Sequence, residues 1–191
     1  MGHMDELADA AADAAGGDPL AAAALVRATQ SDVWRLCAAL GDRGCADDLT
    51  QETYLRAFGS LHRFQNRSTV RTWLLSIARR VCADAVRSRR RKRLTLLRDD
   101  ADLETLLQER TPVDDVAEGA TVADLLARLD PDRREAFVLT QLIGLPYVDA
   151  AQVAGCPVGT IRSRVARARI DLIGSLAGVD EDDGRSEAAH A

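Results

Sequence analysis

The stretch that decides the fold runs from Tyr147 to Arg169 and reads YVDAAQVAGCPVGTIRSRVARAR. Its spacing predicts a short helix, a turn at Gly155 and Pro157, and a second helix. One side of the second helix is apolar and carries Ile161, Val165, Ala168 and Leu172. Arginines surround the remainder of this helix, which is the shape and charge that suit insertion into the major groove of DNA.

The side opposite the apolar stripe combines small residues with arginines. Small Ser163 and Ala166 allow a close approach to base edges, and arginine pairs with guanine or holds phosphate. The N-terminal end of such a helix normally carries the base contacts. The predicted DNA-binding residues are Thr160, Arg162, Ser163, Arg164 and Arg167. The alternative is an arginine-coated, solvated helix in a bundle, and the helix–turn–helix spacing favours DNA binding over it.

Composition predicts an all-α protein. The chain has 191 residues, of which 47 % are apolar and only 4 % aromatic, so its core must be mostly Leu, Ala and Val. The net charge is −5, but the charges are segregated: residues 79–93 hold eight bases and one acid, whereas residues 99–124 hold nine acids and one base. Because local fields steer nucleic acid, the acidic total does not exclude DNA binding.

Several classes of function lack support in the sequence. The cysteines are dispersed and form no CxxC or CxxxC pair, so no metal site is predicted. No phosphate-cradling glycine loop and no nucleophile elbow appears, so we expect no enzyme, no cofactor and no small-molecule substrate. No segment has transmembrane length and no signal peptide is visible, so a cytoplasmic protein without membrane insertion is expected.

The chain divides into two predicted helical domains. The first spans residues 19–93, with helices expected over 19–40, 45–59 and 71–93, and the second spans residues 122–177. Asp18-Pro19 and Asp130-Pro131 each combine a capping residue with proline at the first helical position. A flexible acidic linker is expected over 94–121. Residues 1–18 are expected to be a cloning remnant (Met1–Met4) and a flexible N-terminus, and residues 178–191 a disordered acidic tail.

Both halves contain motifs that closely resemble the extracytoplasmic-function (ECF) group of sigma factors. The segments LDPDRREAF (129–137), GLPYVDAA (144–151) and PVGTIRSR (157–164) resemble sigma region 4. The segment ADDLTQETYLRAF (46–58) is similar to region 2.2, and TWLLSIARRVCADAVR (72–87) to regions 2.3 and 2.4. Two unrelated motif sets in the right order make the resemblance specific, and it covers about Leu20 to Leu176.

The resemblance implies a protein that binds core RNA polymerase and directs it to promoters, catalysing no reaction itself. Region 2 would read and help melt the −10 element, and region 4 would read the −35 element. The family is often held inactive by an anti-sigma factor, so such a partner of unknown identity is expected. The C-terminal helix–turn–helix would then be one of two DNA-contacting parts.

The resemblance also assigns region 2 residues. The polymerase clamp helices would dock on one arc of the 45–59 helix, formed by Asp48, Gln51, Glu52 and Leu55, while Leu49, Thr53 and Ala57 face the core. A loop from Phe64 to Val70 would hold a flipped −10 base, with hydrogen bonds and a pocket offsetting the cost of unstacking. The residues assigned to −10 DNA are Gln65, Asn66, Arg67, Ser68, Arg71, Trp73, Arg79, Arg80, Arg87 and Arg90.

Alternatives from other classes explain less of the chain. A conventional helix–turn–helix regulator would share the C-terminal motif but does not need the Asp-Leu-Thr-Gln-Glu segment (48–52) or Arg-Thr-Trp-Leu (71–74). A polymerase-binding adaptor or an anti-sigma protein would explain the N-terminal half but not the arginines of 161–169. A zinc-type anti-sigma protein would also show a His-x3-Cys-x2-Cys pattern, which the sequence lacks.

Overall fold

The computed structural model describes residues 2–41, 43–96 and 121–187, with side chains for 6–41, 44–92 and 121–176. Within these ranges every regular element is helical, which confirms the all-α prediction. Most of the linker predicted over 94–121, namely residues 97–120, lies outside the described residues.

The N-terminal half is a bundle of four helices. They are α1 (Gly2–Ala15), α2 (Pro19–Leu40), α3 (Ala46–Ser60) and α4 (Val70–Leu96), with single 3-10 turns at Arg43–Cys45 and Leu61–Arg63. The predicted start of α2 is confirmed, because the Asp18 side chain accepts a hydrogen bond from the Leu20 amide at 2.8 Å and Pro19 follows it. The centre of the bundle is filled by Leu25, Val33, Leu36, Leu74, Leu75 and Ala78.

The C-terminal half begins with two capped short helices. Thr121 and Asp124 form a reciprocal capping box at the start of α6 (Val122–Arg128), and Asp130 with Pro131 opens α7 (Pro131–Phe137). α7 continues into a π-helical turn, Val138–Leu142, in which the Ile143 amide donates to the Val138 carbonyl. The helix start predicted at Asp130-Pro131 is therefore present, and the last turn of this helix is wider than an α-helix.

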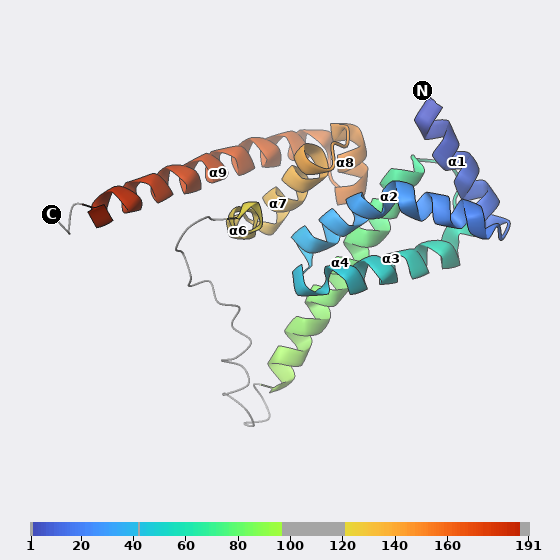
Figure 1. Cartoon of the computed structure of the whole chain (residues 1–191), viewed down its shortest axis with the longest axis horizontal. Coiled ribbons are helices and arrows are strands. Elements are labelled where there is room, and N and C mark those ends of the chain that lie inside the picture. Colours follow the sequence, from blue (N-terminus) through green and yellow to red (C-terminus); the bar gives the residue numbers. More distant parts are fainter. Residues whose placement is uncertain (1, 42, 97–120, 188–191) are drawn as a thin grey trace.

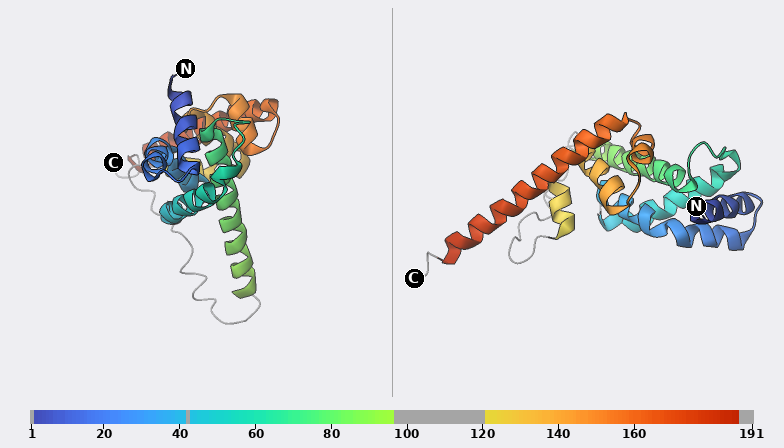
Figure 2. Two further views of the ribbon diagram at one scale, coloured as in Figure 1. Left: turned by 90° about the vertical axis from the view of Figure 1, so that its right-hand side faces the viewer. Right: turned by 90° about the horizontal axis from the view of Figure 1, so that it is seen from above.

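The helix–turn–helix has the predicted geometry. α8 (Tyr147–Ala154) ends at Gly155, which adopts the left-handed conformation with φ of 67°, and α9 (Val158–Glu187) begins three residues later. α9 is much longer than a recognition helix needs, and Figures 1 and 2 show that it runs away from the body of the molecule.

The two halves pack against each other. α8 contacts α4, and α7 contacts α2, so the C-terminal helices lie on one side of the N-terminal bundle (Figures 1 and 2). Arg134 of α7 donates to the Ala39 carbonyl near the end of α2 at 3.4 Å. It also donates to the carbonyls of Ala127, in α6, and of Leu129, which follows α6. Sequence alone predicted two domains but not this contact between them.

Two predicted flexible ends are helical instead. Residues 2–15 form α1, which packs on α2 and buries Ala11, with Leu7 and Ala14 partly buried beside it. These three residues recur at intervals of four and three, so the alanine-rich segment has an apolar stripe that the α2 surface covers. At the other end α9 continues to Glu187, through most of the predicted tail, and no proline interrupts it.

Gly155 offers a test of the turn. Replacing Gly155 with Ala should lower the free energy of unfolding by about 1 kcal/mol, since a β-carbon is disfavoured at φ of 67° while no neighbouring atom lies within 4 Å of it. Gly59→Ala in α3 is the matched control, because its surroundings are equally open but its backbone is helical, and it should be neutral or stabilising. Urea unfolding of both variants measures the difference, and equal losses would contradict this account.

Candidate nucleic-acid interface

The recognition helix is anchored by the predicted apolar stripe. Ile161, Val165 and Ala168 are fully buried, and Ala150, Ala151 and Val153 of α8 are buried against them. Leu172 is partly buried at the end of the stripe. The anchoring fixes which side of α9 faces outward, as the periodicity predicted.

Four of the predicted −35 residues line the outward side at the start of α9. Arg162, Ser163 and Arg167 are exposed and Thr160 is half-buried. The Ser163 hydroxyl donates to the Thr160 carbonyl at 2.9 Å, within the helix. Within the described part of the chain, Arg162 and Arg167 have neither a hydrogen-bond nor an ion-pair partner, so their guanidinium groups are available to a ligand.

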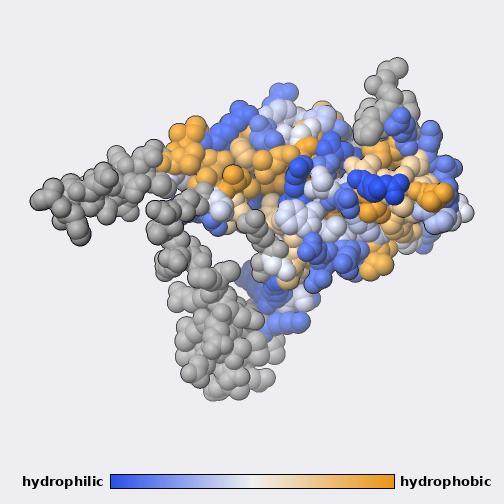
Figure 3. Space-filling model, in the orientation of Figure 1, coloured by the Kyte–Doolittle hydropathy of each residue, from blue (hydrophilic) through white to orange (hydrophobic). Residues whose placement is uncertain are grey.

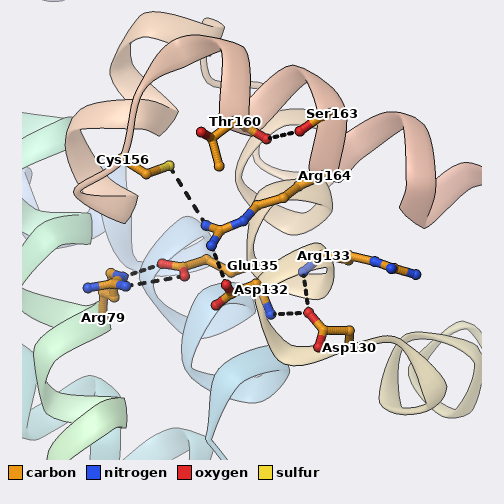
Figure 4. Close-up of polar contacts among 9 residues, drawn as sticks. All are labelled: Arg79, Asp130, Asp132, Arg133, Glu135, Cys156, Thr160, Ser163 and Arg164. Atoms are coloured by element: carbon orange, nitrogen blue, oxygen red, sulfur yellow. Dashed lines mark hydrogen bonds and ion pairs between the residues drawn. The ribbon is translucent and has the colours of Figure 1, made fainter.

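Arg164 is oriented differently from the other predicted −35 residues. Its guanidinium points inward, where one nitrogen pairs with the Asp132 carboxylate of α7 and another lies 3.7 Å from the Cys156 sulfur (Figure 4). Only 23 % of the side chain is exposed. The predicted DNA contact of Arg164 is therefore not available in this side-chain position.

The loop before α4 presents polar side chains, as predicted for a −10 site. Gln65, Asn66 and Arg67 are exposed and Ser68 is half-buried. Asn66 adopts a positive φ of 53°, a conformation that asparagine tolerates better than most residues. Trp73 packs on Phe64 with ring centroids 5.0 Å apart, so an aromatic contact joins the start of the loop to the first turn of α4.

The arginines of α4 fall into two groups. Arg80, Arg87 and Arg90 are exposed, and Arg87 pairs with Asp84 at 2.5 Å. Arg56 and Arg87 together lower the pKa of the Asp84 carboxyl. Arg80 and Arg90 thus remain the most accessible cations of the predicted −10 set on this helix.

The second group, Arg71 and Arg79, faces the C-terminal half. Arg71 donates to the Ile143 carbonyl at 2.7 Å and pairs with Asp32 of α2 at 2.6 Å. Arg79 pairs with Glu135 of α7 (Figure 4). Two residues predicted to bind −10 DNA are therefore engaged by the other half of the molecule in this arrangement.

Glu135 is a buried charged residue of the site. Its side chain is 7 % exposed, and among the described residues Arg79 is the only ion-pair partner of its carboxylate. Burial raises the pKa of the Glu135 carboxyl, and Arg79 opposes that rise. Because a buried carboxylate without a cation is costly, this ion pair ties the two halves together.

The predicted polymerase face of α3 is accessible. Asp48, Gln51 and Leu55 are exposed, and 71 % of Leu55 is open to solvent. Glu52 is half-buried and pairs with Arg56 at 2.7 Å. Leu49, Thr53 and Ala57 are buried, which confirms the predicted inner side of the helix.

Two surface features escaped the sequence prediction. A shallow groove between α2 and α3 borders the α3 face, and in it the indole N–H of Trp34 donates to Asp47 at 2.8 Å. Exposed apolar side chains also follow α9 and α6, where Figure 3 shows a hydrophobic area, and they are Val122, Ile170, Ile173 and Leu176. The periodicity of Ile170, Ile173 and Leu176 was a usable signal for the second feature.

No helix within the described ranges combines the length and the apolarity that crossing a membrane requires. Among the same residues no cluster of three potential metal ligands occurs.

Comparison with known proteins relates both halves to one family. The family model for sigma-70 region 2 matches residues 25–92, and that for sigma-70 region 4 matches residues 120–172. A probable RNA polymerase sigma-C factor of Mycobacterium bovis is 52 % identical over 91 % of each chain, and the ECF RNA polymerase sigma factor EcfG of Rhodopseudomonas palustris is 38 % identical, over 79 % of this chain and 82 % of that protein.

Two solved structures share the architecture at 29 % identity. CnrH, in complex with the cytosolic domain of CnrY, has a TM-score of 0.66 over 88 % of this chain and 96 % of its own. The sigma factor RpoE of Bartonella quintana, in complex with the anti-sigma factor NepR, has a TM-score of 0.61 over 80 % and 94 % of the respective chains. With both regions matched in order, the chain belongs to the extracytoplasmic-function sigma factors of the sigma-70 family.

Proposed function

We propose that this chain binds core RNA polymerase and directs it to promoters, with region 4 contacting the −35 element and region 2 the −10 element. The observation that carries the proposal is the presence of both regions in one chain, each with an exposed polar face. The relatives, named as RNA polymerase sigma factors, support it. The protein itself supplies contacts and no catalytic group, and it works in the cytoplasm, where the polymerase is.

Run-off transcription with core polymerase tests the proposal. A genomic promoter library should give specific transcripts only when the chain and core are both present. A conventional helix–turn–helix regulator would bind its DNA without core polymerase and would not start transcription by itself. Absence of both core binding and initiation would refute the proposal.

The α3 face is the proposed docking site for core polymerase, formed by Asp48, Gln51, Glu52 and Leu55. An exposed leucine among polar side chains suits a helix–helix interface, in which the apolar centre supplies affinity and the charged rim fixes register. The half-buried Glu52 is already oriented by Arg56, so this part of the rim is partly preorganised.

Leu55→Asp should weaken core binding at least tenfold, because a charge would be buried at the centre of the interface. Leu20→Asp is the control, since Leu20 is similarly exposed on α2 but lies outside the proposed face. Biolayer interferometry with immobilised core polymerase measures both variants. Equal affinities for the two variants would place the docking site elsewhere.

For the −35 element we propose direct contacts from Thr160, Arg162, Ser163 and Arg167. Arg167→Ala should weaken binding of the polymerase complex to its promoter by about 1–3 kcal/mol if that side chain reads a base. Arg128→Ala, which removes an exposed arginine of α6, serves as control and should have a smaller effect. Promoter binding is measured by fluorescence anisotropy, and a promoter preference unchanged by Arg167→Ala would exclude base reading.

For the −10 element we propose the loop residues Gln65, Asn66, Arg67 and Ser68, with Trp73 supporting them. The arginines of α4, namely Arg71, Arg79, Arg80, Arg87 and Arg90, would hold the adjacent phosphates. Since Arg71 and Arg79 face region 4 in this arrangement, we further propose that regions 2 and 4 separate before this surface binds DNA. The complex of the sigma factor RpoE with the anti-sigma factor NepR supports an anti-sigma partner of unknown identity for this chain as well.

Arg79→Ala should favour the separated arrangement, because the buried Glu135 would lose its cation. A hydrogen bond to a charged group contributes roughly 1.5–3 kcal/mol, so the ratio of open to closed molecules should rise about tenfold or more. Small-angle X-ray scattering should then show a larger radius of gyration for the free protein. Arg80→Ala, which removes an exposed neighbour, should leave it unchanged, and an unchanged radius for Arg79→Ala would contradict the proposal.

A further inference from the structure

The four arginines near the start of α9 are not equivalent. Arg162 and Arg167 are exposed without a partner among the described residues, and Arg169 donates to Gln141 at the surface at 2.7 Å. Arg164 alone is turned toward the interior of region 4, between α7 and the turn that precedes α9 (Figure 4). Its long side chain therefore connects three separate segments of region 4.

Both partners of Arg164 lie where the main chain is fixed by hydrogen bonds, and 59 % of the Asp132 side chain is open to solvent. Asp132 lies in the first turn of α7, where its amide donates to the Asp130 side chain at 3.0 Å. Cys156 follows the left-handed Gly155, and its amide donates to the Ala151 carbonyl at 3.1 Å. A planar guanidinium that contacts two separate segments restrains the orientation of its helix more than a single point charge does.

The geometry points to Arg164 as a positioning residue of the recognition helix. Through Asp132 and Cys156 it sets the rotation and tilt of α9, so that Arg162, Ser163 and Arg167 meet the DNA. Base readout depends on such orientation, because productive geometry tolerates an error of only about 0.5 Å. This inference rests on the proposed −35 contact and assigns Arg164 a role within region 4 in place of a contact to DNA.

The direction in which Asp132→Asn changes promoter affinity distinguishes a positioning role of this ion pair from a purely electrostatic effect on DNA binding. Asp132→Asn removes a negative charge from a DNA-binding unit, and electrostatics alone would make DNA binding tighter. If Asp132 instead holds Arg164 in place, the same substitution releases α9 and makes promoter binding weaker. Asp149→Asn is the matched control, because Asp149 also lies in the first turn of a region 4 helix but has no ion-pair partner among the described residues.

The experiment uses the complex of the full chain with core polymerase and the promoter fragment that gives the strongest run-off product. Asp132→Asn and Arg164→Ala should each weaken promoter binding about three- to tenfold, and the double variant should be no weaker than either single one. Asp149→Asn should bind equally well or slightly tighter. Arg164→Ala should also leave the slope of log affinity against log salt unchanged, whereas loss of a phosphate contact lowers that slope by about 1.

A second measurement needs no DNA. Amide hydrogen exchange of residues 158–169 in the free protein should accelerate in both Asp132→Asn and Arg164→Ala, relative to wild type and Asp149→Asn. Tighter promoter binding by Asp132→Asn, or a lower salt slope for Arg164→Ala, would overturn the inference. If exchange accelerates as expected but the wild-type complex binds no promoter, the proposed function fails, while the positioning of α9 by Arg164 within region 4 stands.

Discussion

One buried carboxylate forms the ion pair that joins the two halves. Glu135 is almost inaccessible to solvent, and among the described residues its ion-pair partner comes from the opposite half of the molecule. Removing that partner leaves a charge in a poorly solvated place, which raises the free energy of any state that keeps the carboxylate buried and ionised. Region 4 therefore has an energetic reason to stay beside α4 until another group or water satisfies Glu135.

The short helix α7 is the connection between this interaction and the recognition helix. Glu135 contacts region 2, and Asp132, one turn earlier on the same helix, contacts Arg164 of α9. Two carboxylates three residues apart thus face different neighbours, on a helix that Asp130 caps and Pro131 opens. This helix of seven residues consequently contacts region 2 through Glu135 and the recognition helix through Asp132.

Local signals in the sequence predicted the local structure well. The stripe of Ile161, Val165 and Ala168, the capped starts at Asp18-Pro19 and Asp130-Pro131, and the turn at Gly155 are all present as expected, because each follows from backbone chemistry or helical periodicity. The direction of an arginine side chain was not predictable in this way. The partners of Arg71 lie 39 and 72 positions away in the sequence, that of Arg79 lies 56 away and that of Arg164 lies 32 away. Only tertiary packing brings these partners close.

The chemistry of the contact between the halves has a consequence for its tolerance to mutation. Arg71 and Arg134 each reach across to a main-chain carbonyl, at Ile143 and Ala39 respectively, near the end of a helical segment. A carbonyl is present whatever side chain a position carries, so substitutions at Ile143 or Ala39 that preserve the helix leave these acceptors intact. Sequence drift can thus alter much of the contact surface without removing these main-chain acceptors. Glu135, by contrast, accepts through its side chain, so a single substitution at this position removes the acceptor.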